Sequence, residues 1–259
     1  MQGVKAESLT RLPWVKHKFM GRRGGTSPRP WNFLNVSYAV GDVQTRVDEN
    51  RTRICASMQI DSNKFYTVKQ VHGTRAMRIT CGDTDEEVRK IEADAIWTTE
   101  KNVLLGILTA DCAPVLFATE AGEAVGAIHA GWRGAVQQIV PATLKQIAAE
   151  LGLQPNAFRV AIGPCIGFDA FEVGSEVIEE VQKSIDTHGL VKHSKDGRFY
   201  LDLAGLIQKQ LIDNQFSHVE IIHRCTMSNP QEYFSHRASH GKCGRQASVI
   251  SGSGAPGNT

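Results

Sequence analysis

The sequence lacks a long hydrophobic run. Its longest apolar stretch, around Val103 to Leu108, is far shorter than the roughly 18 residues that indicate a membrane-spanning helix. The first residues, MQGVKAESLTRLPW, also contain no apolar segment of the kind found in signal peptides. We therefore expect no membrane partner and a cytoplasmic protein.

An excess of charge of one sign is also missing. The chain carries 29 basic and 27 acidic residues, a formal net charge of +2, and the two signs are interspersed. Proteins that bind nucleic-acid polymers usually present a basic stripe or arm. No nucleic-acid polymer is therefore expected as a partner, and the oligomeric state stays open.

Cysteine is sparse, and several nucleotide-binding motifs are absent. The six cysteines of the 259 residues are irregularly spaced and form no CxxC pair, which argues against a disulfide framework. No GxGxxG and no P-loop sequence occurs. A Rossmann site and a Walker-type phosphate site are therefore not supported.

What is present is an ordinary globular composition, with 41% hydrophobic and 22% charged residues. Alternation, helical spacing and breaks at Gly, Asp and Pro predict an α/β fold. Strands are expected near 15–19, 93–99, 103–119, 124–130, 158–163, 218–223 and 247–250. Helices are expected at 134–152 (bent near Pro141), 175–183 and 202–215. We expect one domain over residues 1–250 and a flexible tail over 251–259.

Three residues share one context at the ends of apolar strands. His72 ends VKQVHG, Cys112 lies in LTADCAPV, and His129 ends VGAIHAGWRG. Strand ends hold side chains rigidly, and the adjacent small residues leave room for a ligand. Two imidazoles and a thiolate suit Zn²⁺, and three protein ligands leave a fourth position open, as in catalytic zinc sites. The alternative is two hydrogen-bonded histidines and a core cysteine.

Two other interpretations compete with this metal site. His236, His240 and Cys243 in SHRASHGKC have metal-like spacing, but the segment is polar and loop-like, which is more typical of a solvated turn. Alternatively, Cys112 could be a nucleophile with His129 or His72 as its base, giving an amide or ester hydrolase.

A loop near the N-terminus is a further candidate. Residues 21–30, GRRGGTSPRP, contain three arginines and follow the strand expected near 15–19. We expect this loop to reach over a site.

Several blocks of the chain resemble signature motifs of the laccase-domain (YfiH) family. They are VKQVHG, ADAIWTT, LGILTADCAPVL, AIHAGWRG, AIGPCIGFDAFEVG and CTMSNPQEYFSHRASHGKCGRQA, in the family's order. The resemblance runs from about Phe19 to Ile250. TADCAPV and HAGWRG together are highly specific, so the chain is identified as a member.

The resemblance carries expectations for fold and function. It implies that His72, Cys112 and His129 bind a catalytic zinc, with copper as a possible substitute. It implies phosphorolysis of adenosine, inosine, guanosine and methylthioadenosine, with deamination of adenosine. It also implies a single layered α-β-β-α domain with mixed sheets, similar to the catalytic domain of cytotoxic necrotizing factor. The partners would be purine nucleosides and phosphate.

These reactions require groups beyond the metal ligands. For deamination, Asp111 beside Cys112 is the leading candidate for the carboxylate that transfers a proton. For phosphorolysis, Arg133 precedes an expected helix start that would attract phosphate. Further candidates for phosphate binding are Arg22, Arg237 and Arg245.

The family name also suggests a copper-dependent polyphenol oxidase. Laccase copper clusters rely on paired HxH motifs, and none of the nine histidines forms such a pair. Oxidation of phenols is therefore the weaker alternative.

The chain departs from its relatives at some loops. MGRRGG replaces the family's usual STRxGG, so Met20 and Gly21 stand where relatives have Ser and Thr. Cys165 replaces a serine, and Asp169 and Ala170 replace a cysteine pair. The substrate preference that the resemblance implies therefore stays open at these loops.

Overall fold

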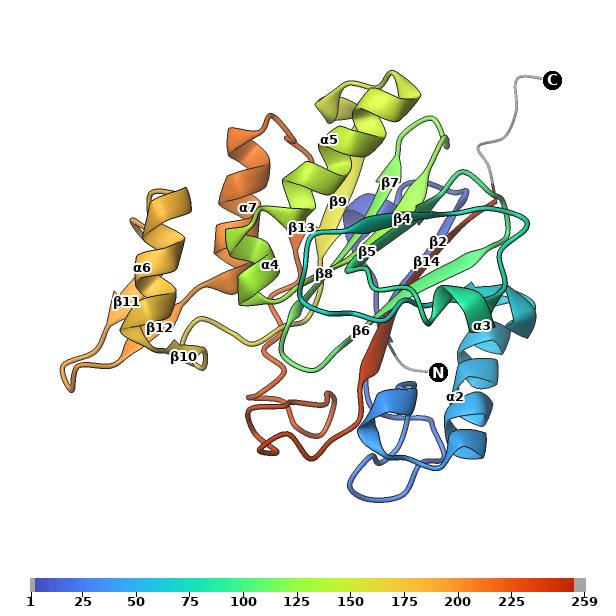
Figure 1. The fold of residues 1–259 in the computed structure, drawn as a ribbon, viewed down its shortest axis with the longest axis horizontal. Helices are drawn as coiled ribbons and strands as arrows, with labels where there is room; N and C mark the ends of the chain where they lie inside the picture. Colours follow the sequence, from blue (N-terminus) through green and yellow to red (C-terminus); the bar gives the residue numbers. More distant parts are fainter. Residues whose placement is uncertain (1–2, 254–259) are drawn as a thin grey trace.

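The computed structural model describes residues 3–253 and has a mixed α/β architecture (Figure 1). Two large sheets and one small antiparallel sheet contain the strands. The expected α/β class with mixed sheets is therefore confirmed. The similarity to the catalytic domain of cytotoxic necrotizing factor stays a prediction.

The six-stranded sheet carries most of the apolar sequence blocks. Its strand order is β13-β9-β7-β8-β5-β4, with β13/β9 and β4/β5 parallel and the other pairs antiparallel. The strands are β4 (Ala76–Ile79), β5 (Ala95–Thr98), β7 (Ala113–Thr119), β8 (Val125–Ala130), β9 (Phe158–Ile162) and β13 (Val219–Ile221). Every residue of β5, β7 and β8 is buried, as expected for a sheet covered on both faces.

The five-stranded sheet has the order β1-β2-β14-β6-β3. Its strands are β1 (Gly3–Val4), β2 (Val15–Met20), β3 (Phe65–Tyr66), β6 (Leu104–Thr109) and β14 (Gln246–Gly252). The last strand, β14, lies between β2 and β6 and pairs antiparallel with both.

The predicted tail begins too early. Ser251 and Gly252 belong to β14 and pair with Lys16 and Val15. The whole length of β14 is buried, so small residues fit at its end. The small, turn-forming residues of this segment did not indicate that it pairs with β2. Residues 254–259, the rest of that predicted tail, lie outside the described residues.

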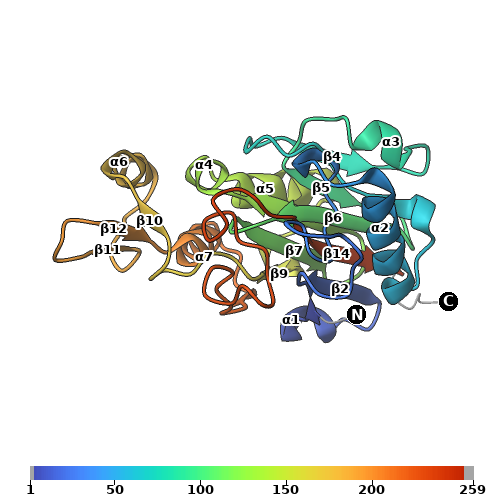
Figure 2. The same ribbon diagram turned by 90° about the horizontal axis from the view of Figure 1, so that it is seen from below.

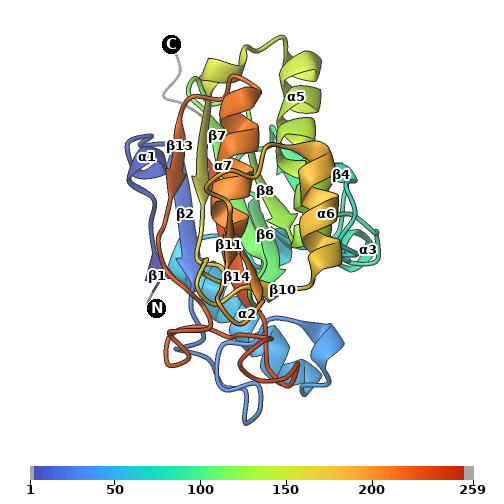
Figure 3. The ribbon, with the colours of Figure 1, turned by 90° about the vertical axis from the view of Figure 1, so that its left-hand side faces the viewer.

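The two large sheets pack face to face, with helices outside them. One apolar cluster between the sheets joins Phe19 and Ile107 to Leu116 and Ala127. The outer face of the six-stranded sheet is covered by α4 (Trp132–Val136), α5 (Ile139–Leu151) and α7 (Leu203–Asp213), which share a second cluster with it. The outer face of the five-stranded sheet packs against α2 (Gln44–Met58). The layers therefore run helix, sheet, sheet, helix, and Figure 3 shows α5, α6 and α7 standing together on one side.

The helix expected at 134–152 is two helices. The chain breaks at Gln138, whose φ of 58° places it in the left-handed region. Pro141 follows in the first turn of α5, where proline is tolerated because its missing N–H has no partner there anyway. The predicted bend at Pro141 is therefore wrong, because the break comes three residues earlier.

The remaining elements lie at the periphery. The small sheet, β10 (Glu172–Val173), β12 (Phe199–Leu201) and β11 (Val191–His193), projects with α6 (Ser175–Ser184) beyond the large sheets (Figure 2). The short helices α1 (Glu7–Thr10) and α3 (Asp85–Val88) lie near the sheet edges. Within residues 3–253, no helix combines the length and apolar character needed to cross a membrane.

Candidate metal centre

Three side chains from three separate segments converge at one end of the sheets. His72 lies in the loop between β3 and β4, Cys112 in the turn between β6 and β7, and His129 near the end of β8. Their nearest nitrogen and sulfur atoms all lie within 4.8 Å of one another. The Sγ of Cys112 is 3.8 Å from Nε2 of His72. The structure thus brings the three predicted ligands together, in a geometry that could hold a metal ion.

The three groups differ in their access to solvent. His129 is buried, Cys112 is half-buried and His72 is exposed. The imidazole rings of His72 and His129 meet edge to face, with centroids 4.8 Å apart. The group therefore lies at the wall of a cavity with His72 on its open side.

A carboxylate that sequence reasoning missed holds two of these ligands. Asp94 is fully buried, and its Oδ1 accepts hydrogen bonds from Nδ1 of His129 at 2.8 Å and from the backbone N–H of His72 at 2.9 Å. Its Oδ2 accepts from the N–H groups of Val71 and Gly73. The signal in the sequence was a lone carboxylate inside an apolar strand block, because such a group must find partners when buried.

Asp94 also determines which nitrogen of His129 faces the cavity. When Nδ1–H donates to the carboxylate, the lone pair of Nε2 is free to bind a metal. The same carboxylate fixes the loop of His72, whose φ of 61° is unusual for a residue other than glycine. Burial raises the pKa of Asp94, but hydrogen bonds from His129 and Gly73 outweigh this and lower it.

Two further contacts keep the ligands close. The side chain of Gln70 bonds both the N–H and the C=O of Leu108, which ties the loop of His72 to β6. Gly131 lies two residues after His129, and a Cβ there would lie 2.8 Å from Cδ2 of His72 and 3.2 Å from Sγ of Cys112. Only glycine leaves both ligands undisturbed at this position.

Cys112 and His129 influence each other's titration. Burial raises the pKa of Cys112, but the neighbouring His129 and His72 outweigh it and lower the pKa overall. Burial lowers the pKa of His129, but Cys112 and Asp94 outweigh it and raise the pKa overall. A thiolate, the form that binds metals, is therefore favoured at Cys112.

Asp111 lies next to Cys112, but its carboxylate is directed to the C-terminal loop. It accepts hydrogen bonds from Oγ1 of Thr226 at 2.6 Å, from Oγ of Ser235 at 3.0 Å and from the N–H of Arg237 at 2.7 Å. Its backbone has a φ of 88°. Asp111 therefore connects the turn that carries Cys112 to the loop that carries Arg237.

The ligand group opens on a cavity of about 600 Å³. Three of the four predicted phosphate-binding arginines line it, namely Arg133, Arg237 and Arg245. Arg133 is not before a helix start, as predicted, but is the second residue of the five-residue helix α4. The guanidinium of Arg237 donates to the carbonyl of Glu172 at 2.9 Å, and that of Arg245 donates to Cys243 and Gly244 carbonyls.

The fourth arginine lies elsewhere. Arg22 lines a different cavity and donates to the backbone carbonyls of Asn32 and Pro230, each at 2.8 Å. None of residues 21–30 lines the cavity of the metal ligands. The loop therefore does not reach over that cavity, because its contacts hold it against the C-terminal loop.

Sequence reasoning also missed part of the cavity wall. Tyr38 and Arg89 also line the cavity. The Arg89 guanidinium lies 4.8 Å from the centre of the Tyr38 ring, whose hydroxyl donates to Asp48 at 2.6 Å. Neither residue belongs to a recognisable motif, so sequence reasoning had no signal for them.

The C-terminal histidine and cysteine cluster does not come together. Within residues 3–253, His72, Cys112 and His129 form the group of His, Cys, Asp or Glu side chains close enough to hold a metal ion. Cys243 is buried beside Arg245, and His236 lines the cavity. The metal-like spacing of this segment thus reflects a loop rather than a ligand set.

Cys165, Asp169 and Ala170, three of the positions expected to differ from relatives, lie in the loop after β9. Cys165 is buried and forms a β-bridge with Cys225, and Asp169 pairs with Lys192 at 2.7 Å. The cavity is instead lined by their neighbours Ile166 and Phe171. The substituted side chains therefore act on the cavity only through the path of this loop.

Comparison with known proteins identifies the family. Residues 16–253 match the family described as multi-copper polyphenol oxidoreductase laccase. The chain is 32% identical over 250 residues to the purine nucleoside phosphorylase YfiH of Escherichia coli, covering 96% of this chain and 94% of that protein. It is 33% identical over 236 residues to a purine nucleoside phosphorylase of Deinococcus radiodurans, covering 91% and 88%.

Solved structures agree with this assignment. The crystal structure of YlmD from Geobacillus stearothermophilus superposes with a TM-score of 0.89 at 27% identity, covering 95% of this chain and 94% of that one. A Bacillus licheniformis protein described as hypothetical protein YfiH gives 0.87 at 28% identity, covering 92% of both chains. The chain therefore belongs to the multi-copper polyphenol oxidoreductase laccase family, whose members include proteins named purine nucleoside phosphorylases.

Proposed function

We propose that the protein is a zinc-dependent purine nucleoside phosphorylase that also deaminates adenosine. Its substrates would be adenosine, inosine, guanosine and methylthioadenosine, with phosphate as the second substrate. The observation that carries this proposal is the convergence of His72, Cys112 and His129 within 4.8 Å beside an arginine-lined cavity. The names of the relatives supply the substrate class.

The donor set fits zinc. A tetrahedral zinc with one thiolate and one imidazole places sulfur and nitrogen about 3.6 Å apart, given the usual bond lengths. The Sγ of Cys112 and Nε2 of His72 are separated by 3.8 Å, close to that value. Bound zinc would supply Lewis-acid chemistry and an open fourth position for activating water.

The arginines would bind phosphate. A planar guanidinium matches phosphate oxygens in a bidentate manner. Arg237 is held at the cavity by Glu172 and, through its backbone, by Asp111. Arg133 and Arg245 line the same space. Phosphate held there would be positioned to take the ribosyl group as the purine leaves.

Apolar walls would take the nucleoside. Tyr38, Trp132, Phe171 and Leu203 line the cavity. Flat rings pack well against such side chains. For deamination we assign the proton transfer to Asp111, the carboxylate beside Cys112, which would have to exchange one of its three hydrogen bonds to do so.

Purine release tests the proposal directly. Purified protein is incubated with each nucleoside, with and without phosphate, and bases and inosine are separated by chromatography. We expect free base and ribose 1-phosphate only when phosphate is present, and inosine and ammonia from adenosine without it. Removal of the metal with a chelator should abolish both reactions, and zinc should restore them. Nucleosides that remain unchanged under all conditions would refute the proposal.

The pairing of Cys112 with His129 supports a second candidate, an amide or ester hydrolase. The lowered pKa of Cys112 and the raised pKa of His129 favour a thiolate beside an imidazolium in the absence of metal. A thiolate bound to zinc is a poor nucleophile, so the chelator separates the two functions. Ester hydrolysis that increases in chelator would favour the hydrolase.

Copper is the third possibility. Copper(II) competes with zinc at nitrogen and sulfur sites. Replacement of the metal by copper, followed by an assay of phenol oxidation, tests this alternative. We expect no turnover of phenols above that of free copper.

A further inference from the structure

A second cavity, also of about 600 Å³, lies between the N-terminal loop and the C-terminal loop. We call it the arginine pocket. It shares no residue with the cavity of the metal ligands. Its lining residues are Arg22, Arg23, Gly24, Arg29, Asn32, Phe33, Pro230 and Gln231.

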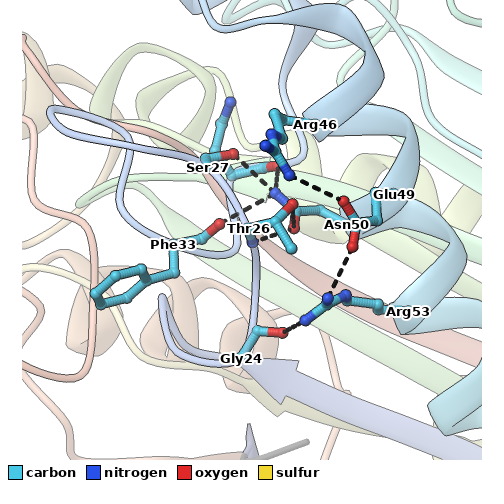
Figure 4. A network of polar contacts seen from close by, with 9 residues as sticks. Gly24, Thr26, Ser27, Phe33, Arg46, Glu49, Asn50 and Arg53 are labelled. Carbon is cyan, nitrogen blue, oxygen red and sulfur yellow. Dashed lines mark hydrogen bonds and ion pairs between the residues drawn. The ribbon is translucent and has the colours of Figure 1, made fainter.

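The loop that forms one wall is fixed to α2 by a buried amide. Asn50 is fully buried, and its Nδ2 lies within 3.1 Å of Oγ of Ser27 and of the carbonyl oxygens of Phe33 and Asn35 (Figure 4). Its Oδ1 accepts from the N–H of Thr26 at 2.9 Å. The Asn50 side chain thus forms hydrogen bonds with both arms of the loop, so this wall of the pocket is preorganised in the absence of a ligand.

A second tie reinforces this wall. Arg53 donates to the carbonyl of Gly24 at 3.1 Å and pairs with Glu49 at 2.7 Å (Figure 4). A Cβ at Gly25 would lie 2.1 Å from the carbonyl oxygen of Phe33, so the two arms of the loop approach as closely as glycine permits.

The other wall is the C-terminal loop, joined through backbone carbonyls. The N–H of Arg22 donates to Glu232 at 2.7 Å, and its guanidinium donates to Pro230. The Nε of Arg23 donates to the carbonyl of Gln231 at 2.8 Å. These bonds orient both guanidinium groups while leaving the terminal nitrogens of Arg23 free for a ligand.

The positive charge of this pocket is not neutralised by neighbours. No Asp or Glu lines it. Among the described residues, the ion pairs of arginine involve other positions along the chain. Arg22 is partly desolvated against Phe234, and this burial lowers its pKa. Three arginines that line one pocket without a carboxylate create a favourable place for an anion.

An aromatic ring lies at the same place. Phe33 lines the pocket and is 48% exposed. Among residues 3–253 it is the only Phe, Trp or Tyr in the exposed class. In Figure 4 its ring points away from Asn50 and the helix. An exposed ring fixed by its backbone offers a flat face on which another ring can stack.

We propose that the arginine pocket binds a phosphate-bearing ligand. Arg23 and Arg29 donate hydrogen bonds to the phosphate, and Phe33 is the surface on which a flat ring of the ligand stacks. A nucleoside monophosphate has both features. This site is separate from the cavity in which we place nucleoside and phosphate turnover, and it does not depend on that assignment.

Backbone amide signals of the isotope-labelled, zinc-loaded protein test the proposal, because they locate binding as well as measure it. Titration with AMP should shift the signals of Arg23, Gly24 and Phe33. In the double variant Arg23→Gln/Arg29→Gln, the Kd for AMP obtained from these shifts should rise at least about tenfold, since hydrogen bonds to charged groups contribute about 1.5–3 kcal/mol each. The matched double variant Arg11→Gln/Arg78→Gln, at exposed arginines outside this network, should bind like the wild type.

Other ligands separate the contributions. Inorganic phosphate and adenosine should each bind more weakly than AMP, as judged from these signals. Phe33→Ala should weaken the binding of AMP without changing the binding of phosphate. Absence of shifts at residues 22–33, or AMP binding unchanged in Arg23→Gln/Arg29→Gln, would overturn the proposal. Adenosine binding as tightly as AMP would refute the role of the arginines. Phosphate binding as tightly as AMP would refute the role of Phe33.

Discussion

His129 and Asp94 are joined twice across neighbouring strand ends. The backbone N–H of His129 donates to the carbonyl of Asp94 at 2.7 Å, and Nδ1 of His129 lies 2.8 Å from Oδ1 of the same residue. Both side chains are almost completely buried. His129, a predicted metal ligand, is thus held by the sheet and by a carboxylate that also binds the loop of His72.

Substitution Asp94→Asn should therefore weaken zinc binding. An amide cannot accept all the hydrogen bonds from His129 and from residues 71–73, so both ligands lose their fixed orientation. Loss of such a supporting group usually costs 10–100-fold in metal affinity, and we expect an effect of about that size. Competition with a chromophoric chelator measures it, and Asp61→Asn at an exposed position is the control. Unchanged affinity would show that Asp94 serves the fold alone.

Gly131→Ala should also reduce metal affinity, for a steric reason. The added methyl would meet His72 and Cys112 at 2.8 and 3.2 Å, so at least one ligand must move. A loss of roughly tenfold or more is expected, as for other disturbances of ligand orientation. Gly82→Ala is a matched control, because a Cβ there meets nothing within 4 Å. Equal zinc affinity of the two variants would contradict this account.

Cys112→Ser tests whether the two proposed reactions share one metal. The hydroxyl keeps the shape of the thiol but binds zinc weakly, so the variant should fold, contain less than the expected one zinc per chain, and lose both reactions. Elemental analysis and purine release measure this. Cys81→Ser, at an exposed cysteine, and His240→Ala should keep their zinc. A folded Cys112→Ser that loses only one reaction would separate the two chemistries.

Asp111→Asn distinguishes proton transfer from positioning. If the carboxylate mainly holds Arg237, the variant should raise KM for phosphate while the deamination kcat changes little. If it transfers the proton, the deamination kcat should fall by about 10²-fold or more, as for other general acid–base residues. Zinc content should remain at the wild-type level in either case. Wild-type kinetics for both reactions would exclude both roles.

The stability of the fold should fall in mild acid because of His17. This side chain is 2% exposed, and its Nε2 accepts the N–H of Ala6 at 2.9 Å. Burial and the nearby Lys5 lower its pKa from 6.5 to about 4. The unfolded chain therefore binds more protons between these values, and stability is lost as the pH falls through this window.

The size of this loss of stability follows from the lowered pKa of His17. Lowering the pH from 7.5 to 5 should cost about 2 kcal/mol of the free energy of unfolding through His17. Urea denaturation at the two pH values measures the loss. His17→Asn should remove that part, and His188→Asn at an exposed histidine should not. Equal pH dependence of the two variants would refute the assignment.

The sequence predicted the fold class well, because the central strands are uninterrupted apolar blocks. It predicted the convergence of the ligands because each stands at the end of such a block. It missed α2, whose residues 44–58 are mostly polar and whose buried stripe is interrupted by Asn50 and Arg51. Asp94 was missed because its role depends on pairing between strands, and Arg22 was misplaced because loop paths depend on long-range hydrogen bonds.

The position of β14 has a consequence for how the site is assembled. This strand comes last in the chain, yet it separates β2 from β6 within the five-stranded sheet. The strand that leads into Cys112 therefore has no antiparallel partner until residues 246–252 have left the ribosome. We therefore expect the candidate metal centre to be complete only once β14 has paired with β6, so that metal binding would follow this pairing rather than precede it.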